Sequence, residues 1–180
     1  MGFNISGLVI NKNYKNDLSA LEAILDEKLV LEKEVMFEEA CESFKGDGYC
    51  DIYFSDKATF VLLAMERGGF EFYADGQEAF SFVLSEMTMT FCVNLSKNGE
   101  LVRTLIETED DQTDDFGEPL PIEEKAEDIP GLIYLLFEQT FGQDFFSIEP
   151  DSKCYRYTFG DAEEQSHFES GDKKPWWKFW

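Results

Sequence analysis

The clearest pattern along the chain is an alternation of apolar and polar residues from Met87 to Leu95. A period of two is typical of a β-strand with one buried face, so a strand is predicted here. The dipeptide Asn98-Gly99 follows, and it favours a two-residue hairpin because both central residues need positive φ. The returning strand is then expected to pair in one register: Leu95 with Val102, Val93 with Thr104 and Phe91 with Ile106.

Two further segments show the three- and four-residue spacing of an amphipathic helix. The first begins at a cap, Asn16 or Asp17, and runs to about Leu29. The second begins after Asp128 and is stopped by Gly142. Other strands are predicted at residues 3–10, 30–37, 50–54, 58–64 and 153–159, and 58–64 is so apolar that it is expected inside the sheet.

These elements predict an α+β fold, a largely antiparallel sheet with two or three packed helices in a single domain of residues 1–160. Residues 161–172 are polar and acidic, which is typical of a flexible tether. Residues 173–180 form a Lys/Trp-rich C-terminal tail.

Charge sets this chain apart, with 38 acidic and 15 basic residues and a formal net charge of −23. Such a surface repels nucleic-acid phosphates and anionic lipids, and it attracts basic proteins and divalent cations. Solubility alone is the simpler explanation. Residues 107–128 hold eleven acids and one base and are predicted to be an exposed loop. Its acidic surface is assigned to Asp110, Asp111, Asp114, Asp115 and Glu118.

The four cysteines, none in a CxxC pair, indicate free thiols in a reducing compartment rather than a zinc site. Residues 1–11 lack the basic start and long apolar run of a signal peptide, and no apolar stretch approaches ~20 residues, so a cytoplasmic location is expected. Residues 1–6 fit the N-myristoylation pattern, but the first strand explains them better.

No catalytic centre is recognisable. The single histidine, His167, lies in the predicted tether, whereas a general base needs a walled position that tunes its pKa. A carboxylate-pair enzyme stays open because acids are abundant, and for the same reason no pair can be named. The acids from Asp110 to Glu118 do not follow the EF-hand spacing, so a solvated run is preferred to a calcium site. No cofactor and no metal site are predicted.

Arg103, one of three arginines, is expected in mid-strand beside Asn94, with Glu107 four residues further along. The preferred interpretation is a cross-strand ion pair that stabilises the fold by under ~1 kcal/mol. The alternative is an anchor for an anionic ligand on the sheet.

The tail is the most informative segment, because it holds all three tryptophans together with three lysines. Exposed tryptophans are unusual unless they bind something. The tail is expected to dock on its own acidic body or on a partner protein; a membrane interface or single-stranded nucleic acid is less favoured because the body repels both. The predicted partner-binding residues are Lys173, Lys174, Trp176, Trp177, Lys178, Phe179 and Trp180.

Residues 85–124 contain the sequence NGELVR followed by GEPLP. In order and spacing, this segment resembles a family of small uncharacterised bacterial proteins. The resemblance implies a bacterial cytoplasmic protein with an α+β fold. The family has no established activity, so the resemblance assigns no functional residue.

The sequence therefore predicts a non-enzymatic acidic interaction module that binds a basic protein, as an immunity or antitoxin-like protein does, with the tail as a recognition element. Two alternatives stay open. The first is a small carboxylate-based enzyme or a domain that binds a divalent metal or ligand. The second is a peripheral membrane protein held by the tail.

Overall fold

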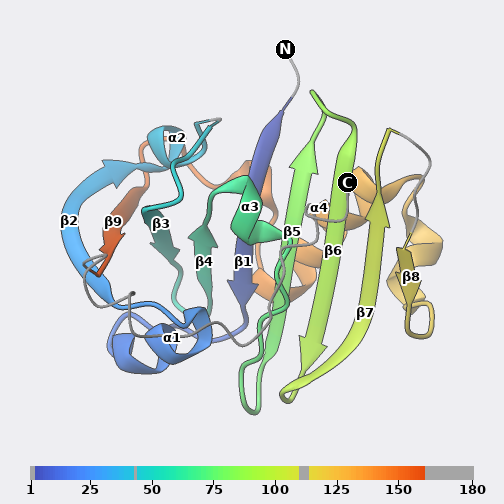
Figure 1. Ribbon diagram of the computed structural model, residues 1–180, viewed down its shortest axis with the longest axis horizontal. Helices are drawn as coiled ribbons and strands as arrows, with labels where there is room; N and C mark the ends of the chain where they lie inside the picture. Colours follow the sequence, from blue (N-terminus) through green and yellow to red (C-terminus); the bar gives the residue numbers. More distant parts are fainter. Residues whose placement is uncertain (1–2, 43, 110–113, 161–180) are drawn as a thin grey trace.

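The computed structural model describes residues 3–42, 44–109 and 114–160, which form a single antiparallel sheet (Figure 1). Its order is β2-β9-β3-β4-β1-β5-β6-β7-β8. The strands are β1 (Asn4–Ile10), β2 (Leu29–Met36), β3 (Tyr49–Phe54), β4 (Thr59–Leu62), β5 (Glu78–Ser85), β6 (Thr90–Lys97), β7 (Glu100–Glu107), β8 (Asp114–Phe116) and β9 (Lys153–Phe159).

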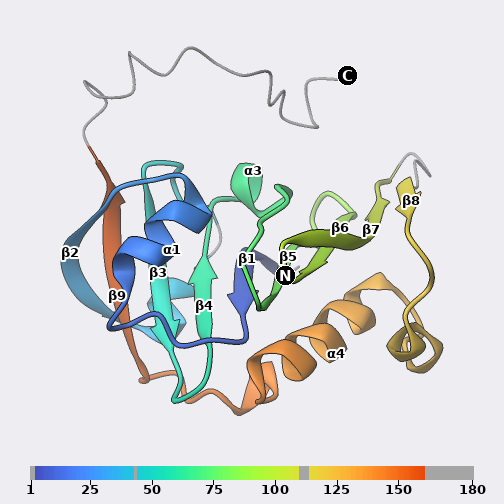
Figure 2. The same cartoon turned by 90° about the horizontal axis from the view of Figure 1, so that it is seen from below.

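Helices cover both faces of this sheet. Helix α1 (Leu18–Leu25) packs on one face and α4 (Ile129–Phe141) on the other (Figure 2). The shorter helices are α2 (Phe37–Ala40), α3 (Met65–Gly68) and the 3₁₀ helices η1 (Pro121–Lys125) and η2 (Phe145–Ser147). The fold is thus a mixed α+β arrangement dominated by its sheet. Within the described ranges, no helix combines the length and the apolar character needed to cross a membrane.

The two faces of the sheet bury separate clusters. Along β1, Ile5 and Val9 join the cluster under α4, whereas Leu8 and Ile10 join the cluster under α1. The α4 cluster is aromatic, and the Phe60 ring lies 5.0 Å from that of Phe137 in an edge-on contact. Burial on both faces explains why β1 and β4 are apolar with little alternation.

Much of the predicted secondary structure is confirmed. Strands β1, β2, β3, β4 and β9 lie where they were expected, and β4 is an internal strand. Helix α4 is capped by Asp128, whose Oδ1 accepts the Gly131 N–H at 2.7 Å, and Gly142 ends it with φ 83°. Helix α1 stops four residues before Leu29, because Asp26 turns left-handed at φ 55° and Leu29 already starts β2.

The β6–β7 hairpin has the predicted turn but a different register. Asn98 and Gly99 both have positive φ, 53° and 81°. The register was predicted wrongly by one residue, because a bulge at Val102 adds a residue to β7. The bulge places Arg103, in place of Val102, opposite Leu95 on the α4 face. The observed pairs are Leu95 with Arg103, Val93 with Leu105 and Phe91 with Glu107.

Two other predictions are wrong, and one strand was missed. Residues 87–89 form an exposed turn, and β6 begins only at Thr90. Strand β5 was not predicted, since its apolar run does not alternate. Residues 107–128 are not a loop throughout, because they include β8 and η1. The predicted tether and tail, residues 161–180, lie outside the described part of the chain.

The sheet has two outer edges, formed by β2 and β8. Strand β2 exposes Glu32, Lys33 and Glu34 at its middle, where its pairing with β9 is also irregular. Strand β8 has three residues, all exposed, of which Asp114 and Asp115 are acidic. Charge, irregularity and short length are the features by which natural sheets resist edge-to-edge pairing.

Candidate interaction surface

Arg103 organises one end of the sheet. Its side chain is 2% exposed. Nε donates to Glu123 Oε1 at 2.6 Å and Nη2 donates to Glu123 Oε2 at 2.9 Å, which is a two-pronged ion pair with η1. Nη1 donates to Asp115 in β8 and to the Phe116 and Gly117 carbonyls at 3.0 and 3.2 Å. One buried guanidinium thus holds both β8 and η1 against the sheet.

The electrostatics of this contact reinforce it. The hydrogen bonds from Arg103 lower the pKa of the Glu123 carboxyl, and the carboxylates raise the pKa of the Arg103 guanidinium. Glu123 also accepts the Leu120 N–H at 2.9 Å, which fixes the start of η1. Arg103 therefore does form a cross-strand ion pair, but with Asp115 of β8 and with Glu123 of η1, and not with Glu107. Arg103 is buried, and its fork is occupied by two acids of the chain itself.

The predicted acidic residues gather at this end of the molecule. Asp114 and Asp115 form β8, and Glu118 follows it in an exposed position. Asp115 is partly committed to Arg103, whereas the side chains of Asp114 and Glu118 form no hydrogen bond or ion pair with other described residues. Asp110 and Asp111 lie outside the described residues, as do the predicted tail residues Lys173, Lys174, Trp176, Trp177, Lys178, Phe179 and Trp180 and the histidine His167.

Positive charge, by contrast, is largely paired with carboxylates of the same chain, and several of these pairs lie at the surface. Between residues 107 and 138 the sequence has twelve acids and a single base, Lys125. Elsewhere the cations are mostly paired with carboxylates. Of the twelve lysines and arginines in the described ranges, nine form ion pairs: Lys12, Lys28, Lys33, Lys45, Arg67, Lys97, Arg103, Lys153 and Arg156.

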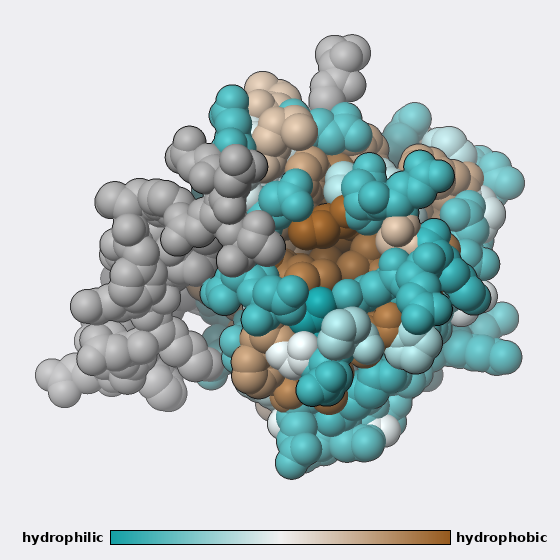
Figure 3. All heavy atoms as spheres, turned by 90° about the vertical axis from the view of Figure 1, so that its right-hand side faces the viewer, coloured by the Kyte–Doolittle hydropathy of each residue, from teal (hydrophilic) through white to brown (hydrophobic). Residues whose placement is uncertain are grey.

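We call five of the exposed acids of β8, η1 and their flanks the acidic end, namely Glu107, Asp114, Glu118, Glu124 and Glu127. Figure 3 views the molecule from the β7–β8 side and shows hydrophilic side chains around a hollow that has hydrophobic residues at its base. Apolar side chains of the same segments, including Leu120 and Ile122, pack half-buried against the α4 cluster. The surface here combines one sign of charge with accessible apolar groups.

Two open hollows lie on the outer side of α4, with volumes of about 390 and 370 Å³. Lys125, Leu135 and Glu138 line both of them. The first is completed by residues that include Asp128, Tyr134 and Asp144, and the second by residues that include Ile122 and Gln139. We call the two together the α4 groove.

A second buried ionic cluster lies at the opposite end of the sheet. Asp51 on β3 is wholly buried, and Arg156 on β9 donates to it from Nε and Nη2 at 2.7 and 2.9 Å. Lys45, 6% exposed, also pairs with Asp51. The Arg156 guanidinium lies over the Tyr49 ring at 4.5 Å. Every partner here is internal, so this cluster is structural.

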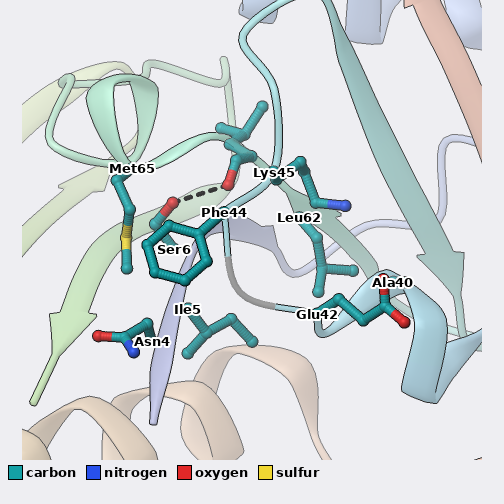
Figure 4. Close-up of a pocket in the computed structure, with 10 residues that line it drawn as sticks. Asn4, Ile5, Ser6, Ala40, Glu42, Phe44, Lys45, Leu62 and Met65 are labelled. Atoms are coloured by element: carbon teal, nitrogen blue, oxygen red, sulfur yellow. Dashed lines mark hydrogen bonds between the residues drawn. The ribbon is translucent and has the colours of Figure 1, made fainter. Parts of the chain in front are cut away.

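A small cavity beside β1 offers little room for chemistry (Figure 4). Its volume of about 10 Å³ corresponds to a single water molecule. Ser6, which lines it, donates its hydroxyl to the Leu63 carbonyl at 2.8 Å. The exposed Phe44 ring lies over Ser6 near Met65.

The thiols are unreactive in this setting. All four cysteines are free, and burial raises the pKa of Cys41, Cys92 and Cys154 to about 12. Burial also raises the pKa of Cys50. A protonated thiol is a weak nucleophile and a weak metal ligand. Among the described residues, no group of three or more His, Cys, Asp or Glu side chains is arranged to hold a metal ion.

Sequence reasoning missed the partners of both buried arginines. Glu123 is one acid among many in an acidic stretch, and nothing local marks it as the partner of Arg103. Asp51 did carry a signal, because it is a lone acid in an apolar strand, and such a residue usually meets a buried cation. No family model, no curated protein and no solved structure matches this chain. The resemblance of residues 85–124 to small bacterial proteins stays a prediction.

Proposed function

We propose that this protein is a non-enzymatic interaction module whose acidic end binds a basic protein, as an immunity or antitoxin-like protein covers a basic toxin. One observation carries the proposal. Twelve acids face a single base between residues 107 and 138, while nine of the twelve described cations are neutralised internally. The charge that this segment offers to a partner is therefore predominantly negative.

Physical reasoning supports such a role. A concentrated patch of one sign steers a partner of opposite charge during encounter and selects against partners of like charge. Ordering a loop on binding costs free energy, and Arg103 removes part of that cost by fixing β8 and η1 beforehand. Apolar groups such as Leu120 and Ile122, half-buried beside these acids, supply contact area for short-range affinity.

The four free thiols support a cytoplasmic location, which we include in the proposal. The enzyme and membrane-protein alternatives lack a comparable observation among the described residues.

The proposal is tested by capture from a lysate of the source cells at low salt, followed by affinity measurement with the purified partner. The test variant reverses three charges of the acidic end: Asp114→Lys, Glu118→Lys and Glu124→Lys. Asp115 and Glu123 are left intact so that the Arg103 contact survives. We expect binding to weaken about tenfold or more, because several attractive pairs become repulsive.

The matched control makes the same change of net charge elsewhere: Glu32→Lys, Asp56→Lys and Glu149→Lys, all exposed. It is expected to weaken binding by no more than about threefold through long-range charge alone. Equal weakening by both variants, or no basic protein retained at low salt, would overturn the proposal.

A further inference from the structure

The α4 groove has a chemistry of its own. Its apolar lining comes from Ile122, Ala126, Tyr134 and Leu135, and Leu135 lines both hollows. Its charged lining is acidic apart from Lys125, with the acids Glu127, Asp128, Glu138 and Asp144. An apolar floor inside an acidic rim suits a segment that carries both bulky aromatic and positively charged side chains.

The chain itself contains such a segment. Residues 173–180 carry three lysines and four aromatic residues, among them all three tryptophans. Each hollow falls within the ~300–1,000 Å³ typical of ligand clefts, which is enough for a bulky aromatic ring. Tryptophan and positive charge together therefore match the two properties of the groove.

The segment can also reach the groove. The chain leaves the sheet at Gly160, whose N–H donates to the Lys28 carbonyl at 2.9 Å. Residues 161–175 precede the first tryptophan and span up to ~50 Å when extended. A folded domain of this size is roughly 40 Å across. The fully extended connection is therefore longer than the domain is wide.

Other exposed apolar side chains fit this segment less well. Val30 and Leu31 are exposed on β2 but line neither hollow. Met87 and Met89 are exposed in the β5–β6 turn but line neither hollow. The α4 groove, by contrast, combines concave apolar area with acidic charge.

From this match we infer that the α4 groove is the docking site of the chain's own residues 173–180. Aromatic rings occupy the hollows on either side of Leu135, and the lysines face the acidic rim. The inference does not require the basic partner proposed above. It makes the tail part of the folded surface and places it beside the acidic end.

Tryptophan fluorescence of the full chain tests this directly, because every tryptophan belongs to the segment. In the native chain we expect emission shifted to the blue and acrylamide quenching several-fold weaker than in the chain unfolded by urea. Leu135→Lys removes the apolar floor and repels the lysines, so it is expected to return both readings to the values of exposed indole. Met87→Lys changes the charge equally at an exposed site and is expected to leave both readings unchanged.

Circular dichroism confirms that each variant is folded. If Leu135→Lys does not fold, Glu138→Lys at the exposed rim provides the test, with a smaller shift in the same direction. Native emission equal to that of the unfolded chain would overturn the inference. The same would follow from an equal response to Met87→Lys, or from a blue shift that is lost on dilution, which would indicate docking between copies.

Discussion

Two buried arginines lie at opposite ends of the α4 face, and they differ in what they hold. Arg156 binds Asp51, its cross-strand neighbour, in a cluster where Lys45 is also buried. Arg103 binds Asp115 and Glu123, which come from segments beyond β7. The first joins two internal strands of the sheet, and the second joins β7 to the short edge strand β8 and to η1.

The two contacts differ in the solvent exposure of their carboxylates, and this determines how strongly each contributes to stability. Asp51 is wholly buried, so losing it leaves two cations without a counter-charge in the core. Asp115 and Glu123 are 60% and 19% exposed, so water can replace part of their contact with Arg103. One arginine therefore serves the stability of the whole sheet, and the other serves the placement of a surface.

The largest effect is expected from Asp51→Asn. This substitution keeps the shape of the side chain but leaves Lys45 and Arg156 buried with only the partly exposed Glu39, 3.6 Å from Arg156, as a nearby carboxylate. Urea unfolding followed by circular dichroism is expected to show a loss of about 3–5 kcal/mol in the free energy of unfolding. A loss below about 1 kcal/mol would mean that the cluster contributes little to the core.

Arg103→Met is expected to cost less, about 2 kcal/mol, because its carboxylate partners can be rehydrated. Its effect should also be local. We expect faster amide hydrogen exchange in residues 114–125, with little change in β3 and β9. Equal acceleration in both regions would show that Arg103 supports the whole sheet and not only its acidic end.

Glu123→Gln removes the negative charge from the contact with Arg103 but keeps nearly the same side-chain shape. Arg103 lowers the folded-state pKa of this carboxyl, so the unfolded chain binds more protons through that window and the stabilisation rises with pH. The stabilisation is complete above the ordinary pKa of about 4.3 and is lost as the pH falls through the lowered value. The wild-type protein should exceed the variant by about 1 kcal/mol at neutral pH, with the difference shrinking below about pH 4. A difference independent of pH would argue against the ion pair.

The smallest effect is expected from Asp17→Asn, which removes an exposed ion pair with Lys12 at 3.7 Å. Both side chains are more than 40% exposed, so solvent screens the pair. We expect a change within about 0.5 kcal/mol in the same unfolding experiment. A larger change would show that solvent exposure does not predict how much an ion pair contributes to the free energy of unfolding, and the ranking of the two arginine sites would lose its basis.

Short sequence motifs correctly predicted one turn and the ends of α4, which are determined by neighbouring residues. Asn98-Gly99 fixed a turn, and Asp128 and Gly142 fixed the ends of α4, because the cause and the effect lie within a few residues. The register of β7, by contrast, depends on residues far along the chain. The bulge at Val102 turns Arg103 toward Asp115 and Glu123, which lie 12 and 20 residues further along the chain.

The sequence predicted the composition of the candidate surface but not the three-dimensional arrangement of its residues. The excess of acids was visible in the sequence, and so was the presence of an aromatic, basic tail. Most cations form ion pairs with carboxylates of the same chain, and one end of the sheet keeps many acids and the single base Lys125. Which cations are paired depends on contacts across the whole sheet. The α4 groove likewise depends on how η1 sits beside α4, which no single segment encodes.

The charged edges of the sheet affect how the protein associates with itself at high concentration. An exposed edge strand can pair with a strand of another molecule. In this protein both edge strands, β2 and β8, carry ionised side chains that oppose such pairing. That protection is electrostatic and therefore conditional. Near the isoelectric point of about 4.2 the repulsion between molecules vanishes, and we expect the same edges to template the growth of sheet from one molecule to the next.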